Sequence, residues 1–389
     1  MGNVLFGGKR ARAHSRAIEE GMKDEFQATV QGIKVLLLGP TNAGKSTFVK
    51  QLRILYGDPY RHEELMNFRR QVHSNALSFL AQLHELAVLE GHGVHSEKDT
   101  HAIYCLSPAA EIEKEDLSLV KRMWTDPGIQ QAYLDRAKAE ISESAEFFIN
   151  RVDEIASEDY LPPHEHILRL RVPTLRLTTT EMRIDGIAFT FFDASAQENK
   201  RGKWLHLFNA VQVVIFVASL ADFDVMSKEN PNENKLAQSI SSLKQLMQEP
   251  ELREVTIMVI LNKSDILGQK LFSIDPAAIR NEITGDKPWA DYTGGIKSTK
   301  GFESYIIDKI KKSHSRKKAP LYFVSNATNS NEVKTIFSYM ENAIIQNYMK
   351  QSFFSTMSVS ATATDKMSKF KRAGMKASLQ ATSKLKVEE

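Results

Sequence analysis

A glycine-rich segment near the N-terminus has the residue types and spacing of a phosphate-binding loop. Residues 39–46 fit the pattern G-x-x-x-x-G-K-[ST], between an apolar run and a helical stretch. In such a loop, backbone N–H groups and the following helix N-terminus attract phosphate oxygens. Lys45 would neutralise the outer phosphates, and the Ser46 hydroxyl would hold Mg²⁺. An ordinary glycine-rich turn is the alternative. The residues expected to contact phosphate are Gly39, Pro40, Thr41, Asn42, Ala43, Gly44, Lys45, Ser46 and Thr47.

A second motif, Asn262-Lys263-Ser264-Asp265, indicates which base the nucleotide carries. It follows the apolar run 255–261, at the carboxyl end of a predicted strand, where open α/β sheets bind ligands. The Asp265 carboxylate can accept hydrogen bonds from N1–H and the exocyclic amine of guanine, a pair that adenine lacks. The Lys263 stem can stack over the base, and Ala327, after the last strand, could donate its N–H to the guanine oxygen. A lone N-K-x-D is weak, so a solvated loop is the alternative.

Alternating strands and helices surround these motifs. Apolar runs at 33–38, 211–218, 255–261 and 321–324 are typical of parallel strands that are covered on both faces. Helical stretches are expected around 47–55, 201–209, 235–248 and 331–350. Met182–Phe192 predicts a hairpin that turns at Asp185-Gly186. The pattern predicts an α/β fold with a mostly parallel sheet and helices on both faces.

Residues from about 61 to 165 break this alternation. Apolar residues recur there at helical spacing: Leu65, Phe68, Val72, Ala76, Phe79, Leu80, Leu83 and Ala87. Residues 117–124 and 130–155 are also predicted to be helical, so we expect an all-helical insertion. The loop 91–101 carries three histidines without acids or thiolates at ligand spacing, which favours a solvated loop over a metal site.

Composition narrows the class of protein. The chain has 389 residues, 42% hydrophobic and 25% charged, which is enough for a buried core. Its single cysteine, Cys105, excludes a disulfide framework and fits a reducing compartment. The longest apolar stretch, 211–221, is too short to span a bilayer, and no secretory signal is predicted. The net charge is +3. Residues 356–389 carry the excess of basic residues, so the rest of the chain is close to neutral. The charge of the rest of the chain therefore does not predict nucleic-acid binding.

From about residue 33 to 354 the chain resembles the α subunits of heterotrimeric G proteins. Five segments carry this resemblance: 45–55, 124–130, 168–174, 193–197 and 261–265. It implies a Ras-like P-loop GTPase domain at 31–60 and 168–355, interrupted by an inserted helical domain at 61–167. It also implies an N-terminal helix or membrane-targeting segment at 1–30. Residues 356–389 would be a basic, disordered tail, with an amphipathic membrane segment as the alternative.

The resemblance implies roles for individual residues. Arg171 corresponds to a built-in arginine finger and Gln197 to the residue that orients the attacking water. Thr174 would join Ser46 as a Mg²⁺ ligand, with Asp193 nearby through water. Ser144 would reach the phosphates from the insertion. The other implied nucleotide contacts are Leu168, Arg169, Leu170, Val172, Pro173, Ala194, Ser195 and Ala196. Without the resemblance, Arg169, Arg171 and Gln197 would be ordinary solvated residues.

The chain departs from the family pattern around the γ-phosphate. Thr41 stands where the family has a glycine that leaves room for the attacking water. Asn42 replaces a glutamate that pairs with the finger arginine, so Arg171 is expected to lose an anchor. Ser195 and Ala196 replace two glycines of the switch loop, and Gln238 replaces a glutamate that pairs with a switch arginine, here Arg201. We expect hydrolysis to be slow and the switch to be stiff.

Two functions follow from these observations. The first is a Mg²⁺-dependent GDP/GTP switch that slowly hydrolyses GTP and couples a membrane receptor and a βγ dimer to an unknown effector. The second is a non-switching guanine-nucleotide-binding scaffold that sequesters βγ or another partner. An ATP-using kinase is disfavoured by Asp265.

Gly2 suits N-myristoylation, although Phe6 stands where Ser or Thr is preferred. Peripheral attachment to the cytoplasmic face of the plasma membrane, with a cytosolic fraction, is therefore expected.

Overall fold

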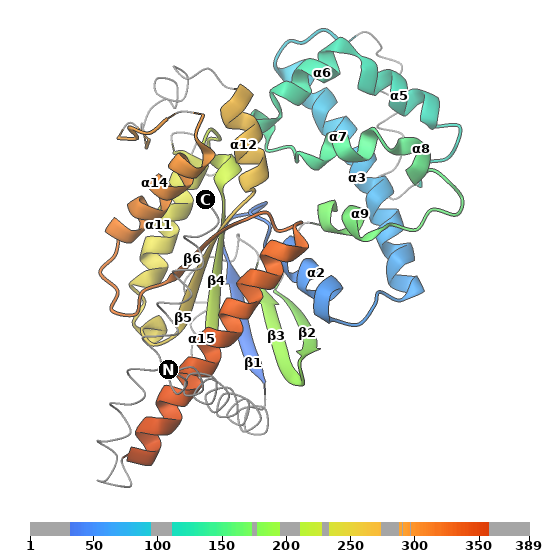
Figure 1. Cartoon of the computed structure of the whole chain (residues 1–389). Helices are drawn as coiled ribbons and strands as arrows, with labels where there is room; N and C mark the ends of the chain where they lie inside the picture. Colours follow the sequence, from blue (N-terminus) through green and yellow to red (C-terminus); the bar gives the residue numbers. More distant parts are fainter. Residues whose placement is uncertain are drawn as a thin grey trace, which may run out of the picture. The chain divides into compact units, whose positions relative to one another are not determined.

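A six-stranded sheet has helices packed around it (Figure 1). The computed structural model describes residues 32–94, 111–172, 177–194, 211–227, 233–273, 288–289, 291–295 and 297–357. The strands follow the order β2-β3-β1-β4-β5-β6. Their bounds are β1 (Ile33–Leu38), β2 (Thr178–Ile184), β3 (Ile187–Asp193), β4 (Val213–Ser219), β5 (Thr256–Asn262) and β6 (Leu321–Ser325). All neighbours are parallel except β2 and β3. The predicted α/β class with a mostly parallel sheet is confirmed.

Burial explains why these segments form strands. Every residue of β4 and β5 is buried, as parallel strands covered on both faces require. The β2–β3 hairpin turns at Asp185 (φ 48°) and Gly186 (φ 82°). Two consecutive positive φ angles match the twist of a tight two-residue hairpin. The predicted hairpin is therefore confirmed, with strands longer than expected.

Helices cover both faces of the sheet. On one face, α11 (Lys235–Met247), α12 (Ser264–Ser273) and α14 (Thr299–Lys312) pack their apolar residues into the cluster that contains Leu36. Ile33 and Leu36 of β1 point to opposite faces of the sheet, because side chains alternate along a strand. Phe189 lies in register with Ile33 and therefore points away from the Leu36 cluster. There its ring contacts Phe337 of α15 (Ser330–Met357), which also contacts Tyr56 of α2 (Lys45–Tyr56). The sequence predicted α2, α11 and α15, although α15 is longer than expected, and it missed α12 and α14.

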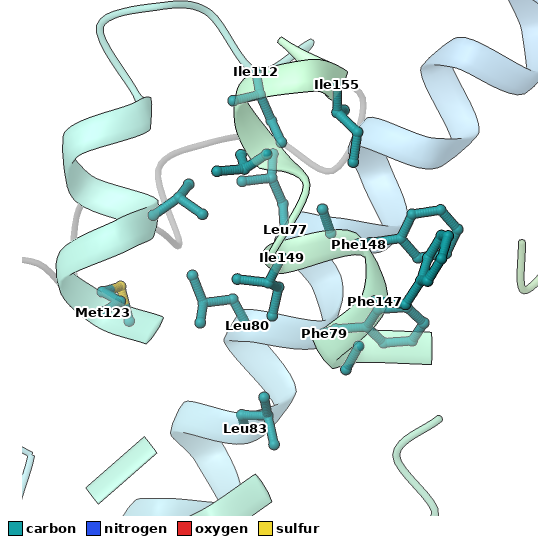
Figure 2. Packing of buried hydrophobic residues seen from close by; sticks show 14 of the residues in the cluster. Leu77, Phe79, Leu80, Leu83, Ile112, Met123, Phe147, Phe148, Ile149 and Ile155 are labelled. Atoms are coloured by element: carbon teal, nitrogen blue, oxygen red, sulfur yellow. The ribbon is translucent and has the colours of Figure 1, made fainter. Parts of the chain in front are cut away.

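The insertion has its own hydrophobic core (Figure 2). Its longest helix, α3 (His62–Leu89), buries Val72, Ala76, Leu80 and Leu83 at the predicted spacing. Leu77, Phe79 and Leu80 of α3 lie close to Phe148 and Ile149 of α7 (Figure 2). The other elements are α5 (Leu117–Thr125), α6 (Pro127–Leu134), the 3₁₀ turn η1 (Arg136–Ala139), α7 (Ser144–Ile149), α8 (Val152–Ile155) and α9 (His164–Arg169).

The expectation of a continuous helix over 130–155 was wrong. The chain leaves helical geometry between η1 and α7, where Glu140 adopts a φ of 51°. A left-handed residue ends an α-helix because the next N–H groups turn away from the helix axis. A second break, at Asn150 and Arg151, separates α7 from α8. Glu140 and Glu143 lie in the turn between η1 and α7, and both side chains pair with lysines of the sheet domain.

Within the described ranges, no helix combines the length and apolarity that crossing a membrane requires. No group of three or more His, Cys, Asp or Glu side chains is placed there to hold a metal ion. Of the three histidines near residue 95, His92 lies 3.0 Å from Asp135, between Nε2 and Oδ2. His95 and His101 lie outside the described residues.

Candidate nucleotide-binding site

Strand register brings the predicted motifs to one edge of the sheet. Leu37, just before the glycine-rich loop, lies beside Asp193 at the end of β3. Asn262 at the end of β5 lies beside Ser219 of β4 and Ser325 of β6. The glycine-rich loop, the Asn262–Asp265 motif and the loop after β6 therefore meet at the carboxyl edge, where α/β sheets bind ligands.

The glycine-rich loop follows a path that requires its glycines. Gly39 (φ 134°) and Gly44 (φ 101°) have backbone angles that side chains disfavour. A Cβ at Gly39 would lie 2.0 Å from the Val217 carbonyl oxygen, and one at Gly44 would lie 2.0 Å from Asn262 Nδ2. Asn42 has a φ of 64°, which asparagine tolerates better than most residues. Gly44 then caps α2 without a side-chain bond, so the first N–H groups of α2 face the loop.

Lys45 is buried at the base of this loop. Its Nζ donates to the carbonyl oxygens of Gly39 (2.8 Å) and Pro40 (2.9 Å). Burial lowers the pKa of Lys45 to about 8, although the Asp193 carboxylate acts to raise it. A phosphate group would stabilise the ammonium form and raise this pKa. The position and charge of Lys45 therefore suit an anionic ligand.

Ser46 and Asp193 form a pair that fits a cation. The Ser46 hydroxyl donates to Asp193 Oδ2. Asp193 is buried, and its Oδ1 has no hydrogen-bond partner among the described residues. Burial raises the pKa of Asp193, while the Ser46 bond and the charge of Lys45 act to lower it. A buried carboxylate oxygen without a donor beside a serine hydroxyl fits Mg²⁺, which prefers oxygen ligands.

Asn262 links the phosphate end of the site to the base end. Its Nδ2 donates to the Ala43 carbonyl oxygen (2.7 Å), and its Oδ1 accepts from the Ala327 N–H (2.8 Å). The N–H that the sequence assigned to the guanine oxygen therefore binds Asn262 here. Asp265 is exposed in the first turn of α12, where a ligand could reach its carboxylate.

Glu332 holds the loop after β6 and was not anticipated from the sequence. Its Oε2 accepts from the Asn326 N–H (2.6 Å), and its Oε1 accepts from Asn329 Nδ2 (2.9 Å). Asn326 Oδ1 in turn accepts from the Thr328 N–H (2.9 Å). The loop that presents Ala327 is thus held by its own side chains and by Glu332 in the first turn of α15.

Two acidic residues of the insertion pair with lysines of the sheet domain. Glu143 Oε2 lies 3.1 Å from Nζ of Lys263, a residue of the base motif. Burial, the largest single influence, acts to raise the pKa of Glu143, but the charge and hydrogen bond of Lys263, a backbone hydrogen bond and the charge of Lys270 together lower this pKa to about 2. Lys235 lies between Glu140 (3.5 Å) and Asp222 (3.4 Å), and all three side chains are largely buried. Sequence analysis found neighbouring Ser144 but neither acid.

The segment that follows α9 carries Arg171. Its Nη1 donates to the Glu140 carbonyl oxygen (3.3 Å). Burial lowers the pKa of Arg171, and the charges of Glu140 and Glu143 act to raise it. Arg171 therefore has an anchor in the insertion even though Asn42 replaces the expected glutamate.

The residues just before Arg171 are tied to α2. Thr47 Oγ1 donates to the Leu168 carbonyl oxygen (3.3 Å). Lys50 Nζ donates to the carbonyl oxygens of Ile167 (3.0 Å) and Leu170 (3.1 Å). The Arg169 side chain instead pairs with Glu165 (3.3 Å), and its guanidinium lies 4.5 Å from the Phe147 ring centroid.

Several predicted site residues lie outside the described part of the chain, and their roles stay predictions. They are Gly2, Pro173, Thr174, Ser195, Ala196, Gln197 and Arg201. Of the remaining residues, Ala194 is buried, Val172 is exposed, and Ser144 begins α7 beside Glu143.

Comparison with known families agrees with this geometry. A family described as the G-protein alpha subunit matches residues 12–344 of the chain. The chain belongs to the G-protein alpha-subunit family. The match includes the glycine-rich loop, the helical insertion and the Asn262–Asp265 motif, so the resemblance seen in the sequence is confirmed. G-protein alpha subunits are, as a family, guanine-nucleotide-binding GTPases that use Mg²⁺.

Proposed function

We propose that this alpha subunit is a GDP/GTP switch that hydrolyses GTP slowly in the presence of Mg²⁺. The bridge made by Asn262 carries the proposal. It joins the phosphate loop at Ala43 to the base loop at Ala327. A single nucleotide lying along this bridge would contact both loops, with its base near Asp265 and its phosphates near Lys45.

The nucleotide would be held at three points. The loop 39–47 would bind the phosphates through backbone N–H groups and the Lys45 ammonium. Asp265 would accept from N1–H and the amine of guanine, and Lys263, held by Glu143, would cover the base. Ser46, Thr174 and, through water, Asp193 would hold Mg²⁺, which would neutralise charge on the phosphates.

Hydrolysis would depend on two side chains. Gln197 would orient a water for attack on the γ-phosphorus, which breaks the bond to the β-phosphate oxygen and releases GDP and inorganic phosphate. The Arg171 guanidinium would stabilise the negative charge that builds up during this transfer. Burial around Arg171 strengthens such a contact because little water competes with it.

A displacement assay tests the binding part of this proposal. A fluorescent GDP analogue bound to the full chain should be displaced by GDP and by GTP but not by ATP at the same concentration. Equal displacement by ATP would contradict the assignment of Asp265 and Lys263.

The proposed cellular role is that of a transducer. The alpha subunit would pair with a βγ dimer, respond to a membrane receptor and act on an effector at the cytoplasmic face of the plasma membrane, partly in the cytosol. A myristoyl group on Gly2 would give only marginal membrane binding, since one acyl chain rarely anchors a protein stably. The basic residues between 9 and 16 would add attraction to anionic lipid.

The alternative is a scaffold that binds guanine nucleotide without switching. Thr41, Ser195, Ala196 and Gln238 favour it, because each stands where the family has a residue that permits turnover or locks the active state. The two functions differ in turnover. A scaffold would bind GTP as tightly as a switch and leave it intact.

Thr41→Gly should accelerate GTP hydrolysis by about tenfold, since a displacement of the reacting groups by a fraction of an ångström has effects of this order. Thr41 lies in the phosphate loop next to Asn42, and its branched side chain would crowd the attacking water. Single-turnover hydrolysis of preloaded GTP measures the change. The matched control is Thr335→Gly, an exposed threonine of α15. An unchanged rate would show that Thr41 is not the cause of slow turnover.

Glu143→Gln should make GDP dissociate about fivefold faster. The charged pair with Lys263 joins the insertion to the base motif, and a partly buried pair of this kind contributes about 1 kcal/mol. The dissociation rate of a fluorescent GDP analogue gives the result. Glu158→Gln serves as the control because its pair with Lys114 lies within the insertion and is exposed. If both variants release GDP at the same rate, this pair does not retain the nucleotide.

A further inference from the structure

Asn75 makes two hydrogen bonds to the backbone of a single residue far along the chain. It lies in the middle of α3, in the helical insertion. Its Oδ1 accepts from the Arg171 N–H (2.8 Å), and its Nδ2 donates to the Arg171 carbonyl oxygen (2.9 Å). The two residues are separated by 96 positions in the sequence. The side-chain amide thus pairs with Arg171 as a neighbouring strand residue would.

Such a pair constrains Arg171 more than one bond could. A single hydrogen bond leaves a peptide free to rotate about it, whereas two bonds on both sides of one Cα fix the position and the orientation of that residue. Arg171 lies beyond the end of α9, in a segment without regular structure among the described residues. Its N–H and carbonyl group therefore need partners from elsewhere, and Asn75 supplies both.

The surrounding contacts hold the same residue from other sides. Lys50 binds the carbonyl oxygen of the preceding Leu170, and the Glu140 carbonyl oxygen accepts from the Arg171 guanidinium. Lys50 belongs to the phosphate-loop helix, whereas Asn75 and Glu140 belong to the insertion. Arg171 is thus held between the two parts of the fold, and among the described residues Asn75 is the one that binds both polar groups of its backbone.

We propose that Asn75 is a positioning residue for GTP hydrolysis. It holds the Arg171 backbone in one position, from which the guanidinium can reach the transferring phosphoryl group. The inference rests on the proposed function, in which Arg171 stabilises the charge of the transition state. It also makes the insertion part of the catalytic machinery, since hydrolysis then depends on a residue of α3.

Two variants test this inference. Asn75→Ala removes both bonds. Asn75→Asp keeps the size of the side chain and the acceptor for the Arg171 N–H, but it places a second oxygen against the Arg171 carbonyl oxygen. Both variants should lower the single-turnover rate of GTP hydrolysis by about 10- to 100-fold, which is the order expected for a misplacement of about 1 Å. Their affinity for GDP should stay within about twofold of that of the unmodified chain.

The control is Gln82→Ala, which removes another amide from α3. Gln82 Nε2 donates to Ser78 Oγ (2.8 Å) within the same helix, and in the described part of the chain it makes no hydrogen bond to Arg171. The Gln82→Ala rate should equal that of the unmodified chain. A rate as low as that of Asn75→Ala would show that any weakening of α3 slows hydrolysis, which would contradict a specific role for Asn75.

A double variant separates positioning from general stability. Arg171→Ala keeps the backbone groups that Asn75 binds but lacks the guanidinium. If Asn75 acts through that guanidinium, Asn75→Ala should not slow the residual hydrolysis of Arg171→Ala any further. A further loss of tenfold in this background would overturn the inference.

The failure of this inference is distinguishable from the failure of the proposed function. An unmodified chain that binds GTP and never hydrolyses it contradicts both. An unmodified chain that hydrolyses GTP, with Asn75→Ala and Asn75→Asp at the same rate, contradicts the role of Asn75 alone. Hydrogen exchange gives an additional readout: the Arg171 amide should be protected in the unmodified chain and exchange faster in Asn75→Ala.

Discussion

Replacing Asp265 with asparagine should change the base preference of this alpha subunit from guanine to xanthine. The Asp265 carboxylate is expected to accept two charge-assisted hydrogen bonds from guanine, each contributing about 1.5–3 kcal/mol. Asparagine offers one oxygen and an amide donor, which meets the exocyclic amine of guanine donor to donor. Affinity for GDP should therefore fall by about 100-fold or more. Xanthine has an oxygen in place of that amine, so xanthosine diphosphate should bind the variant better than GDP does.

Competition for a fluorescent nucleotide analogue measures both affinities. Asp308→Asn is the matched control, because Asp308 is an exposed aspartate of α14 that pairs with a neighbouring lysine. It should bind GDP as the unmodified chain does. The assignment of Asp265 would be wrong if Asp265→Asn kept its full affinity for GDP.

Arg171→Ala should lower the single-turnover rate of GTP hydrolysis by about 1000-fold. Arg171 is half-buried, and its guanidinium is bound to the Glu140 carbonyl oxygen of the insertion. Charge stabilisation of this kind acts on the transition state and hardly on the bound GTP. We therefore expect the affinity for a non-hydrolysable GTP analogue to change by less than about fivefold.

Arg122→Ala provides the comparison for Arg171→Ala. Arg122 is an exposed arginine of α5, in the helical insertion. Its removal should leave the hydrolysis rate unchanged. If both substitutions changed the hydrolysis rate only slightly, Arg171 would have no role in the mechanism.

The sequence predicted those parts of the fold that depend on local pattern. The buried runs of β4 and β5, the Asp185-Gly186 hairpin and the amphipathic α3 all depend on residues close together in the chain. The glycine-rich loop was recognisable for the same reason, because Gly39 and Gly44 are required by backbone geometry within eight residues. Periodicity did not reveal the break at Glu140, since an isolated left-handed residue leaves no hydrophobic pattern.

The contacts that join the insertion to the sheet domain could not be predicted from the sequence. Glu143 and Lys263 are 120 residues apart, and nothing in their neighbourhoods marks them as a pair. Asn75 is one polar residue on a long helix and resembles any solvated side chain until Arg171 is placed beside it. The replacement of the family's glutamate by Asn42 predicted that Arg171 would lose an anchor. The sequence could not show that Glu140 and Asn75 bind Arg171 instead.

Single-turnover hydrolysis of GTP that has been preloaded onto the full chain distinguishes the switch from the scaffold most directly. We expect added Mg²⁺ to start a slow, first-order conversion of the bound GTP to GDP and phosphate, and a chelator to stop it. Bound GTP that stays intact with Mg²⁺ present, while GDP and GTP bind with normal selectivity over ATP, would contradict the switch and favour the scaffold.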